Sequence, residues 1–187
     1  MLLAAACLLF ANFAGAEDLS AAELYWNKHG VYYQIFVRAF ADGDGDGLGD
    51  LQGILNSLDY LEDLGVSGIW LTPIHPSPSY HKYDVTDYYG VDREIGTLDD
   101  FHRLIKEAHR RGLKIILDLV LNHTSKDHPW FAQAALDLQS PFREYYIWAT
   151  PDTDVKQLGP WGQRVWHPLG SAHYYGLFWE GMPDLNY

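Results

Sequence analysis

Residues 31–50 read Val-Tyr-Tyr-Gln-Ile-Phe-Val-Arg-Ala-Phe-Ala-Asp-Gly-Asp-Gly-Asp-Gly-Leu-Gly-Asp. The first half, residues 31–40, is almost continuously apolar and aromatic, which is the pattern of a β-strand buried on both faces. The second half is a loop in which acidic residues alternate with glycine. Strands buried on both faces are typical of parallel sheets covered by helices, so this stretch predicts the beginning of an α/β fold.

The acidic loop has the composition of a cation site. Its alternate positions hold four carboxylates and one leucine, whose backbone carbonyl is available: Asp42, Asp44, Asp46, Leu48 and Asp50. Charges this close repel one another unless a cation lies between them, and the intervening glycines let the chain curl around it. The spacing resembles an EF-hand loop, although Gly53 stands where that loop carries its glutamate. The pattern predicts a Ca²⁺ or Mg²⁺ site, with a solvated Gly/Asp linker as the alternative.

The pattern after this loop alternates between helix and strand. Leucine and isoleucine recur at helical spacing over residues 51–64, with Gly65 as the expected C-terminal cap. Residues 66–71 read as a second buried strand, and a long loop rich in Pro, Ser, His and Tyr follows over residues 72–89.

A second helix is expected to begin after Thr97, which can cap it, and to end at Gly112. Residues 113–120 then read as a third buried strand. Strand, helix, strand, helix, strand predicts parallel βαβ units with right-handed crossovers. From residue 124 onward this alternation stops, and only residues 130–138 keep a helical pattern.

The bulk composition limits the classes of partner. The chain has 187 residues and is 48% hydrophobic, which suits one domain with a buried core. Its net charge of -12 argues against nucleic acid or an anionic membrane surface as a partner. The high aromatic content suits stacking on sugar rings, although aromatic residues serve cores equally well.

The first 16 residues have the character of a targeting segment. Residues 1–16 are mostly apolar and end in Ala-Gly-Ala, like a cleavable signal peptide, and they are too short for a confident membrane span. This predicts a mature chain that starts near Glu17 and is exported to the periplasm or the extracellular space without membrane attachment. The only cysteine, Cys7, follows a very short apolar stretch, which argues against anchoring as a lipoprotein.

Three polar clusters follow the three expected strands, and in parallel sheets that edge binds ligands. They are the acidic loop, residues 81–89, and the end of the third strand. Asp118 lies in an apolar strand and should meet a cation, either an arginine outside this chain or one from a neighbouring strand, since an unpaired buried carboxylate is costly. A structural ion pair is as consistent with Asp118 as a catalytic role.

Three other side chains in these clusters could each have more than one role. His123 could bond a sugar hydroxyl, bind a metal or be a satisfied loop histidine. Asn122 could offer its carbonyl oxygen to Ca²⁺ or cap a turn, and Tyr83 could stack on a substrate ring or simply pack.

Five segments together resemble the α-amylase family, glycoside hydrolase family 13. They occur in the family's order, at residues 30–50, 68–73 (Gly-Ile-Trp-Leu-Thr-Pro), 83–88 (Tyr-Asp-Val-Thr-Asp-Tyr), 118–123 (Asp-Leu-Val-Leu-Asn-His) and 182–186 (Met-Pro-Asp-Leu-Asn). The resemblance implies a (β/α)₈ TIM barrel and retaining chemistry on α-glucosidic bonds, with an Asp nucleophile and a Glu acid/base. It divides the chain into residues 17–123, the N-terminal part of the barrel, and residues 124–187, the excursion called domain B.

The resemblance also implies roles for single residues. Tyr83 matches the tyrosine that forms a platform under the sugar at the cleavage site, and His123 matches the histidine that hydrogen-bonds its hydroxyls. Asp118 matches an aspartate that holds a strand-four arginine. Asn122 and Asp184 match positions that hold a second calcium in many α-amylases. The five acidic-loop residues named above match a metal site found in a subset of the family.

Two positions depart from the family pattern. Lys82 stands where glycine is common, and Tyr80 stands where exo-acting α-glucosidases carry an aspartate. The second departure favours an endo-acting α-amylase on starch-like α-glucans or maltooligosaccharides. The alternatives are an α-glucosidase or transglycosidase of the same family, and a non-catalytic amylase-like carbohydrate-binding or partner subunit.

The matched segments include none of the family's three catalytic carboxylates, which follow later strands. We therefore expect an incomplete barrel of three strands, belonging to a longer enzyme. We also expect the 187 residues alone to show no starch hydrolysis and to aggregate through the unpaired strand edges.

Overall fold

The computed structural model describes residues 30–187. The expected signal peptide at residues 1–16, Cys7 and the first part of the expected barrel segment, residues 17–29, lie outside the described residues. Within residues 30–187, none of the helices has both the length and the apolar character needed to cross a bilayer.

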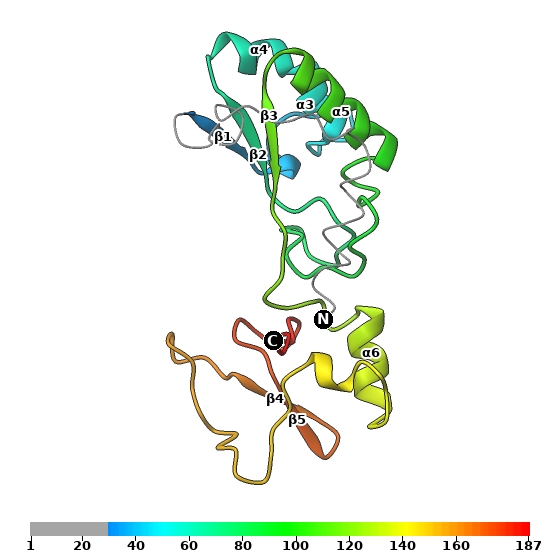
Figure 1. The fold of residues 1–187 in the computed structure, drawn as a ribbon, viewed down its shortest axis with the longest axis vertical. Coiled ribbons are helices and arrows are strands. Elements are labelled where there is room, and N and C mark those ends of the chain that lie inside the picture. The colour runs from blue at the N-terminus through cyan, green and yellow to red at the C-terminus, as the bar shows by residue number, and fades with distance from the viewer. Residues whose placement is uncertain (1–29) are drawn as a thin grey trace, which may run out of the picture. The chain divides into compact units, whose positions relative to one another are not determined.

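Three short strands form a parallel sheet in the order β1-β2-β3 (Figure 1). They are β1 (Tyr32–Ile35), β2 (Gly68–Leu71) and β3 (Lys114–Leu117), in uninterrupted parallel register. Their carboxyl ends are therefore aligned, as in the pairing of Ile35 with Leu71. The parallel βαβ arrangement and the incomplete barrel expected from the sequence are both confirmed.

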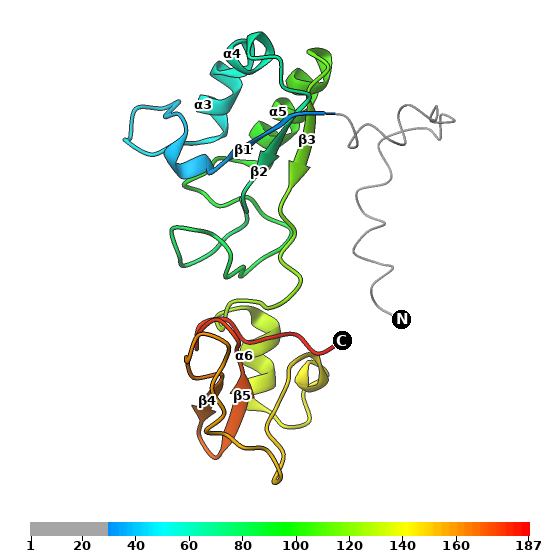
Figure 2. The same cartoon turned by 90° about the vertical axis from the view of Figure 1, so that its left-hand side faces the viewer.

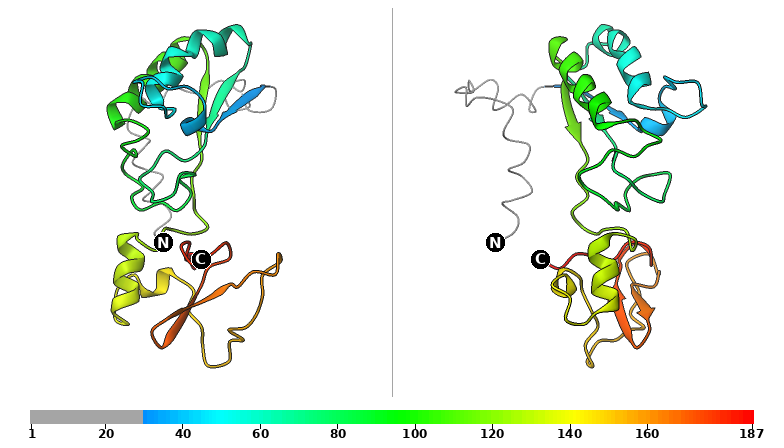
Figure 3. Two further views of the ribbon diagram at one scale, coloured as in Figure 1. Left: turned by 180° about the vertical axis from the view of Figure 1, so that it is seen from behind. Right: turned by 90° about the vertical axis from the view of Figure 1, so that its right-hand side faces the viewer.

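Helices cover one face of this sheet (Figures 1 and 3). They are α3 (Leu51–Asn56), α4 (Leu58–Asp63) and α5 (Leu98–Arg110). Their apolar side chains and one face of the strands form a single buried cluster that includes Ile35 and Leu104. Hydrophobic burial along this one interface is the main source of stability for this part of the chain.

The prediction that the strands are buried on both faces is wrong for the described residues. In β1, Ile35 is buried while its neighbour Gln34 is exposed. In β2, Ile69 is fully buried while Trp70 is 38% exposed. Side chains alternate between the two faces of a strand, and only one face here is packed against helices. The strands are also shorter than the apolar runs that predicted them, and residues 37–39 form a 3₁₀ turn, η3 (Val37–Ala39), instead of continuing β1.

The single helix expected over residues 51–64 is two helices, α3 and α4, that break at Ser57. Its backbone lies at φ -100° and ψ 4°, outside the helical region, and its hydroxyl donates to the Gly53 carbonyl at 2.8 Å. Side chains such as serine compete for backbone groups in this way, which ends a helix. The expected cap at Gly65 is confirmed by its left-handed φ of 76°.

The boundaries of α5 agree with the sequence prediction. The Thr97 hydroxyl accepts from the Asp100 N–H, and the Asp100 carboxylate accepts from the Thr97 N–H, which is a capping box. Gly112 follows the helix with a φ of 74°, a conformation that favours glycine.

The remainder of the described chain carries one longer helix and one hairpin (Figure 2). The elements are α6 (Pro129–Leu136), the 3₁₀ helix η4 (Arg143–Tyr145), β4 (Trp166–Leu169) and β5 (Ala172–Tyr175). Strands β4 and β5 pair antiparallel, and aromatic side chains form a second buried cluster between α6 and β5. The sequence pattern predicted the helix but not the hairpin.

Candidate functional site

Asp118 lies directly after β3 and joins two aromatic residues. Its Oδ2 accepts from the Tyr83 O–H at 2.6 Å, and its Oδ1 accepts from the Trp70 indole N–H at 2.6 Å. Within residues 30–187 no arginine from a neighbouring strand pairs with this half-buried carboxylate, and the two neutral donors satisfy it instead. Trp70 was missed by sequence reasoning, since only the parallel register brings it beside Asp118.

The contact with Asp118 orients the Tyr83 ring. Burial and the hydrogen bond to this carboxylate raise the pKa of the Tyr83 phenol to about 12. The phenol is therefore a donor at neutral pH, and its bond to Asp118 restricts rotation of the ring. Tyr83 remains partly exposed, so part of its ring can meet a ligand.

His123 is buried, with 4% of its surface exposed, and one of its ring nitrogens has no partner. Nε2 makes no hydrogen bond within residues 30–187, while Nδ1 lies 3.3 Å from the Asn122 amide nitrogen. Burial lowers the pKa of His123, which the Tyr83 backbone and Asp84 oppose only in part. The imidazole is therefore neutral at pH 7, and Nε2 is a buried polar atom without a hydrogen-bond partner in the described residues.

Tyr88 holds the segment that carries His123. Its hydroxyl lies 2.8 Å from the carbonyl oxygen of Val120 and 3.1 Å from that of His123. Burial raises the pKa of this phenol, so the hydroxyl stays a donor. The role of Tyr88 was not identified from the sequence, although it closes the segment Tyr-Asp-Val-Thr-Asp-Tyr.

Lys82, immediately before Tyr83, has an unusual backbone and a buried ammonium group. Its φ is 63°, in the left-handed region that glycine adopts without cost, which explains why a glycine suits this position. The side chain is 5% exposed, and its Nζ lies 2.8 Å from the Asp92 carboxylate and 3.2 Å from Glu94. A paired, buried lysine thus fixes the backbone on one side of Tyr83.

The structure brings Asn122 and Asp184 together. His123 and Asp184 form an antiparallel bridge, and the Leu185 N–H donates to the Asn122 carbonyl at 2.9 Å. Burial raises the pKa of Asp184, while the Leu177 N–H and the Asn122 side chain oppose this effect. Two oxygen-bearing side chains therefore meet at the point where residues 122–123 contact residues 184–185.

The acidic loop gathers three of its four carboxylates. One oxygen from each of Asp42, Asp44 and Asp50 lies within 4.8 Å of the others, while Asp46 is outside this group. The Asp46 carboxylate instead accepts from the Leu48 N–H at 2.8 Å. Three converging carboxylates are a donor set that hard cations such as Ca²⁺ and Mg²⁺ prefer, so the residues fit such an ion.

Backbone hydrogen bonds fix the shape of this loop. The Asp42 carboxylate accepts from the N–H groups of Asp44, Gly45 and Gly47, with distances between 2.6 and 3.1 Å. These bonds lower the pKa of Asp42, so it is ionised at neutral pH. Asp50 is the N-cap of α3 and accepts from the Gly53 N–H at 2.6 Å. The loop is therefore tied to the first helix after β1.

A family model described as "Alpha amylase, catalytic domain" matches residues 34–187. Among solved structures, the α-amylase from H. orenii is 59% identical, with a TM-score of 0.80 over 86% of this chain and 34% of that one.

Two curated relatives carry different activities in their names. "Alpha-amylase 3" of Dictyoglomus thermophilum is 49% identical over 162 residues, which cover 87% of this chain and 31% of the relative. An oligo-1,6-glucosidase of Bacillus sp. (strain F5) is 44% identical over 168 residues, covering 87% of this chain and 33% of the relative. The chain thus spans about a third of the length of the curated relatives it matches.

Proposed function

This chain belongs to the α-amylase family of glycoside hydrolases, family 13, and we propose that it forms the sugar-binding edge of an enzyme that cleaves α-glucosidic bonds in starch-like glucans or maltooligosaccharides. The observation that carries this proposal is the buried, neutral His123, whose Nε2 has no partner within residues 30–187. A buried nitrogen left without a partner costs stability, and a hydroxyl of a bound sugar would satisfy it.

The neighbouring tyrosine completes this binding site. The Tyr83 ring, held by Asp118, offers an apolar face on which one face of a glucosyl ring can stack. His123 would then bond the hydroxyls of the same sugar, so one residue supplies apolar contact and the other supplies polarity. Together they would orient a glucosyl unit at the carboxyl ends of the strands, the edge at which barrels of this kind bind ligands.

A cation would have a structural role in this proposal. We propose that Asp42, Asp44 and Asp50 hold Ca²⁺ or Mg²⁺, with Asp46 and Leu48 as further oxygen sources. The ion would neutralise the carboxylates and stabilise the turn between β1 and α3. The pair Asn122 and Asp184 is proposed as part of a second site, because its two side chains already lie together.

Tyr80 supports an endo-acting α-amylase over an exo-acting enzyme. Its side chain is 66% exposed, and its ring contacts Phe36 and His81 edge-on at 6.3 and 5.2 Å. It offers no carboxylate that could bind the non-reducing end of a sugar chain. The interior of a long glucan can therefore bind at this site as well as its end. An α-glucosidase is the second candidate, and the similarity to an oligo-1,6-glucosidase supports it.

The test is a chimera in which residues 34–187 replace the matching third of the H. orenii α-amylase. We expect it to cleave an end-blocked p-nitrophenyl maltoheptaoside, which only an endo-acting enzyme accepts, and to ignore p-nitrophenyl α-glucoside. The reverse preference would support the α-glucosidase. A chimera that melts cooperatively but cleaves neither compound, while the parent amylase cleaves the first, would contradict the proposal.

A further inference from the structure

A cavity beside the β4–β5 hairpin is lined by basic side chains and by no acidic one. Its volume is about 300 Å³, at the lower end of the volumes of small-molecule sites. The lining residues are Val155, Lys156, Leu158, Arg164, Trp166 and His173. The chain as a whole carries 25 acidic residues against 13 lysines and arginines, so a wall with two of these cations and no carboxylate is opposite to its overall charge.

One wall of this cavity is a single face of the hairpin. Side chains alternate between the two faces of a strand, and the positions of Trp166 and His173 lie two residues apart in the paired register, so both point to the same face. Tyr174 points to the opposite face and is buried in the aromatic cluster beside α6. The face that carries Trp166 and His173 is therefore the one that this cluster leaves for the cavity.

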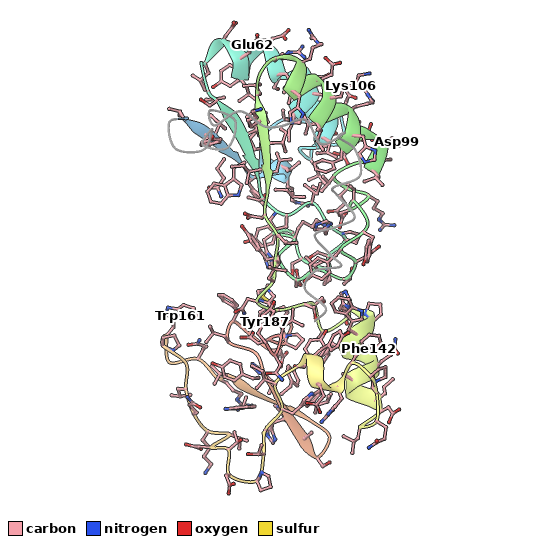
Figure 4. The ribbon with its side chains drawn as sticks, viewed as in Figure 1. Glu62, Asp99, Lys106, Phe142, Trp161 and Tyr187 are labelled. Carbon is pink, nitrogen blue, oxygen red and sulfur yellow. The ribbon has the colours of Figure 1, made fainter. Side chains whose placement is uncertain are left out.

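The loop before β4 forms the other wall. An antiparallel bridge between Leu158 and Arg164 closes this loop, and the Gly159 N–H donates to the Gln163 carbonyl at 2.8 Å. Figure 4 shows Trp161 at the outer turn of the loop, between the two bridged residues in sequence. The bridge fixes the backbone from which the Arg164 side chain extends, so less freedom is lost when a ligand binds to it.

The two cations of the cavity have no acidic partner among residues 30–187. None of the ion pairs in this part of the chain involves Lys156 or Arg164. The Asp154 carboxylate, two residues from Lys156, accepts from the Lys156 backbone N–H at 3.0 Å and does not line the cavity. Because like charges repel one another, two unpaired cations at one cavity favour an anion between them.

A buried donor without a partner indicates the same kind of ligand. Trp166 is 8% exposed, and its indole N–H makes no hydrogen bond within the described residues. Buried N–H groups are nearly always paired, because leaving one unpaired costs free energy. An indole nitrogen can only donate, so the partner that it lacks must be an acceptor such as an anionic oxygen.

We propose that this cavity binds a phosphate-type oxyanion, either inorganic phosphate or the phosphate group of a small phosphate ester. Arg164 would contact two of its oxygens at once, Lys156 would add a second positive charge, and Trp166 would donate to a further oxygen. A phosphate suits donors that come from several directions better than a carboxylate, which has only two oxygens. His123 and Tyr83 do not line this cavity, so the inference does not depend on the proposed function.

The experiment titrates inorganic phosphate, in buffer without Ca²⁺, into the chimera that carries residues 34–187. Arg164→Gln is expected to weaken phosphate binding by about tenfold, because it removes the charge and the paired donors at similar length. Trp166→Phe keeps an aromatic ring and removes only the N–H, and should weaken binding by about threefold. The matched control is Arg103→Gln on α5, which should bind phosphate as the wild type does. The melting temperature of each variant checks that it keeps the fold.

A second arm distinguishes the two sources of phosphate. Glucose 6-phosphate and inorganic phosphate are compared in the same chimera, and tighter binding of one identifies it as the better ligand. Arg164→Gln should weaken both phosphate compounds and leave glucose binding and cleavage of the end-blocked maltoheptaoside unchanged.

Three results would overturn the phosphate site. They are the absence of saturable binding for both phosphate compounds, equal affinity in the wild type and Arg164→Gln, and a loss in Arg103→Gln as large as that in Arg164→Gln. Each of them would leave the proposed sugar site standing, because cleavage of the maltoheptaoside is measured separately.

Discussion

Replacing Lys82 by methionine should destabilise the loop that carries Tyr83 by about 3 kcal/mol, because the change leaves the Asp92 carboxylate buried without a cation. Asp92 is 7% exposed and lies 2.8 Å from the lysine Nζ, whereas Glu94 is largely exposed and contributes little. Methionine keeps the length and apolar character of the stem. The left-handed backbone at φ 63° is also kept, so its cost of roughly 1–2 kcal/mol cancels in the comparison.

The assay is a double-mutant cycle measured by urea unfolding. Asp92→Asn alone and the double variant Lys82→Met/Asp92→Asn complete the cycle, and the double variant should recover most of the loss because it leaves no buried charge. We expect a coupling free energy of about 2 kcal/mol at pH 7. A coupling below about 0.5 kcal/mol, the limit for independent sites, would refute the claim that this ion pair holds the loop.

The coupling between Lys82 and Asp92 should also depend on pH. Burial raises the pKa of Asp92, but the Lys82 ammonium and the Glu94 and Ser77 N–H groups outweigh it and hold the pKa below the ordinary value of 3.8. A lowered carboxyl pKa stabilises the folded state above pH 3.8 and loses this effect as pH falls through the folded-state value. The wild-type advantage over Lys82→Met should therefore shrink below pH 3.8.

Three further predictions concern the metal, the tyrosine and the chain by itself. Adding Ca²⁺ should raise the melting temperature, and Asp44→Asn should reduce that rise more than Asp46→Asn, because only Asp44 lies in the three-carboxylate group; equal effects would contradict this. Tyr83 should ionise near pH 12, so the difference in absorbance at 295 nm between wild type and Tyr83→Phe should develop well above pH 10. The hydrogen bond from Tyr83 to Asp118 stabilises the fold below about pH 10, and this stabilisation is lost as pH rises through about 12. The 187-residue chain should release no reducing sugar from soluble starch, and turnover above a blank would show that it is sufficient for catalysis.

The sequence predicted those features that depend on neighbours along the chain. The boundaries of α5 follow from Thr97 and Gly112, whose side-chain and backbone chemistry act within one turn. Features that depend on burial were predicted less well. The apolar run at residues 31–40 indicated a longer strand buried on both faces, but β1 covers only Tyr32–Ile35 and one face is packed.

The sequence of the β4–β5 hairpin contains one signal that favours a hairpin and one that argues against it. A turn of Gly170 and Ser171 separates two runs with aromatic residues, and Gly170 has the positive φ of 58° that a tight hairpin turn needs. Pro168 argues against a strand, yet it is tolerated because β4 pairs only with β5 among the described strands and is therefore an edge strand.

The contacts of the candidate site join residues far apart in sequence. Trp70, Tyr83 and Asp118 meet only because the parallel register aligns the ends of β2 and β3. Residue types at the strand ends identified Tyr83 and Asp118 as candidates, but not which donors the carboxylate would meet. The resemblance to a family supplied roles that the local pattern left open, and the structure added Trp70, Tyr88 and the ion pair of Lys82.

The most direct test of the account is the contribution of His123 to sugar binding. Maltose is titrated into three forms of the chimera that carries residues 34–187: the wild-type sequence, His123→Leu, which removes the unpartnered Nε2 at similar size, and His109→Leu, a control at the exposed end of α5. We predict that His123→Leu weakens maltose binding by about tenfold or more while His109→Leu binds as the wild type does. Equal maltose affinity in the wild type and His123→Leu would contradict the claim that this buried imidazole receives a sugar.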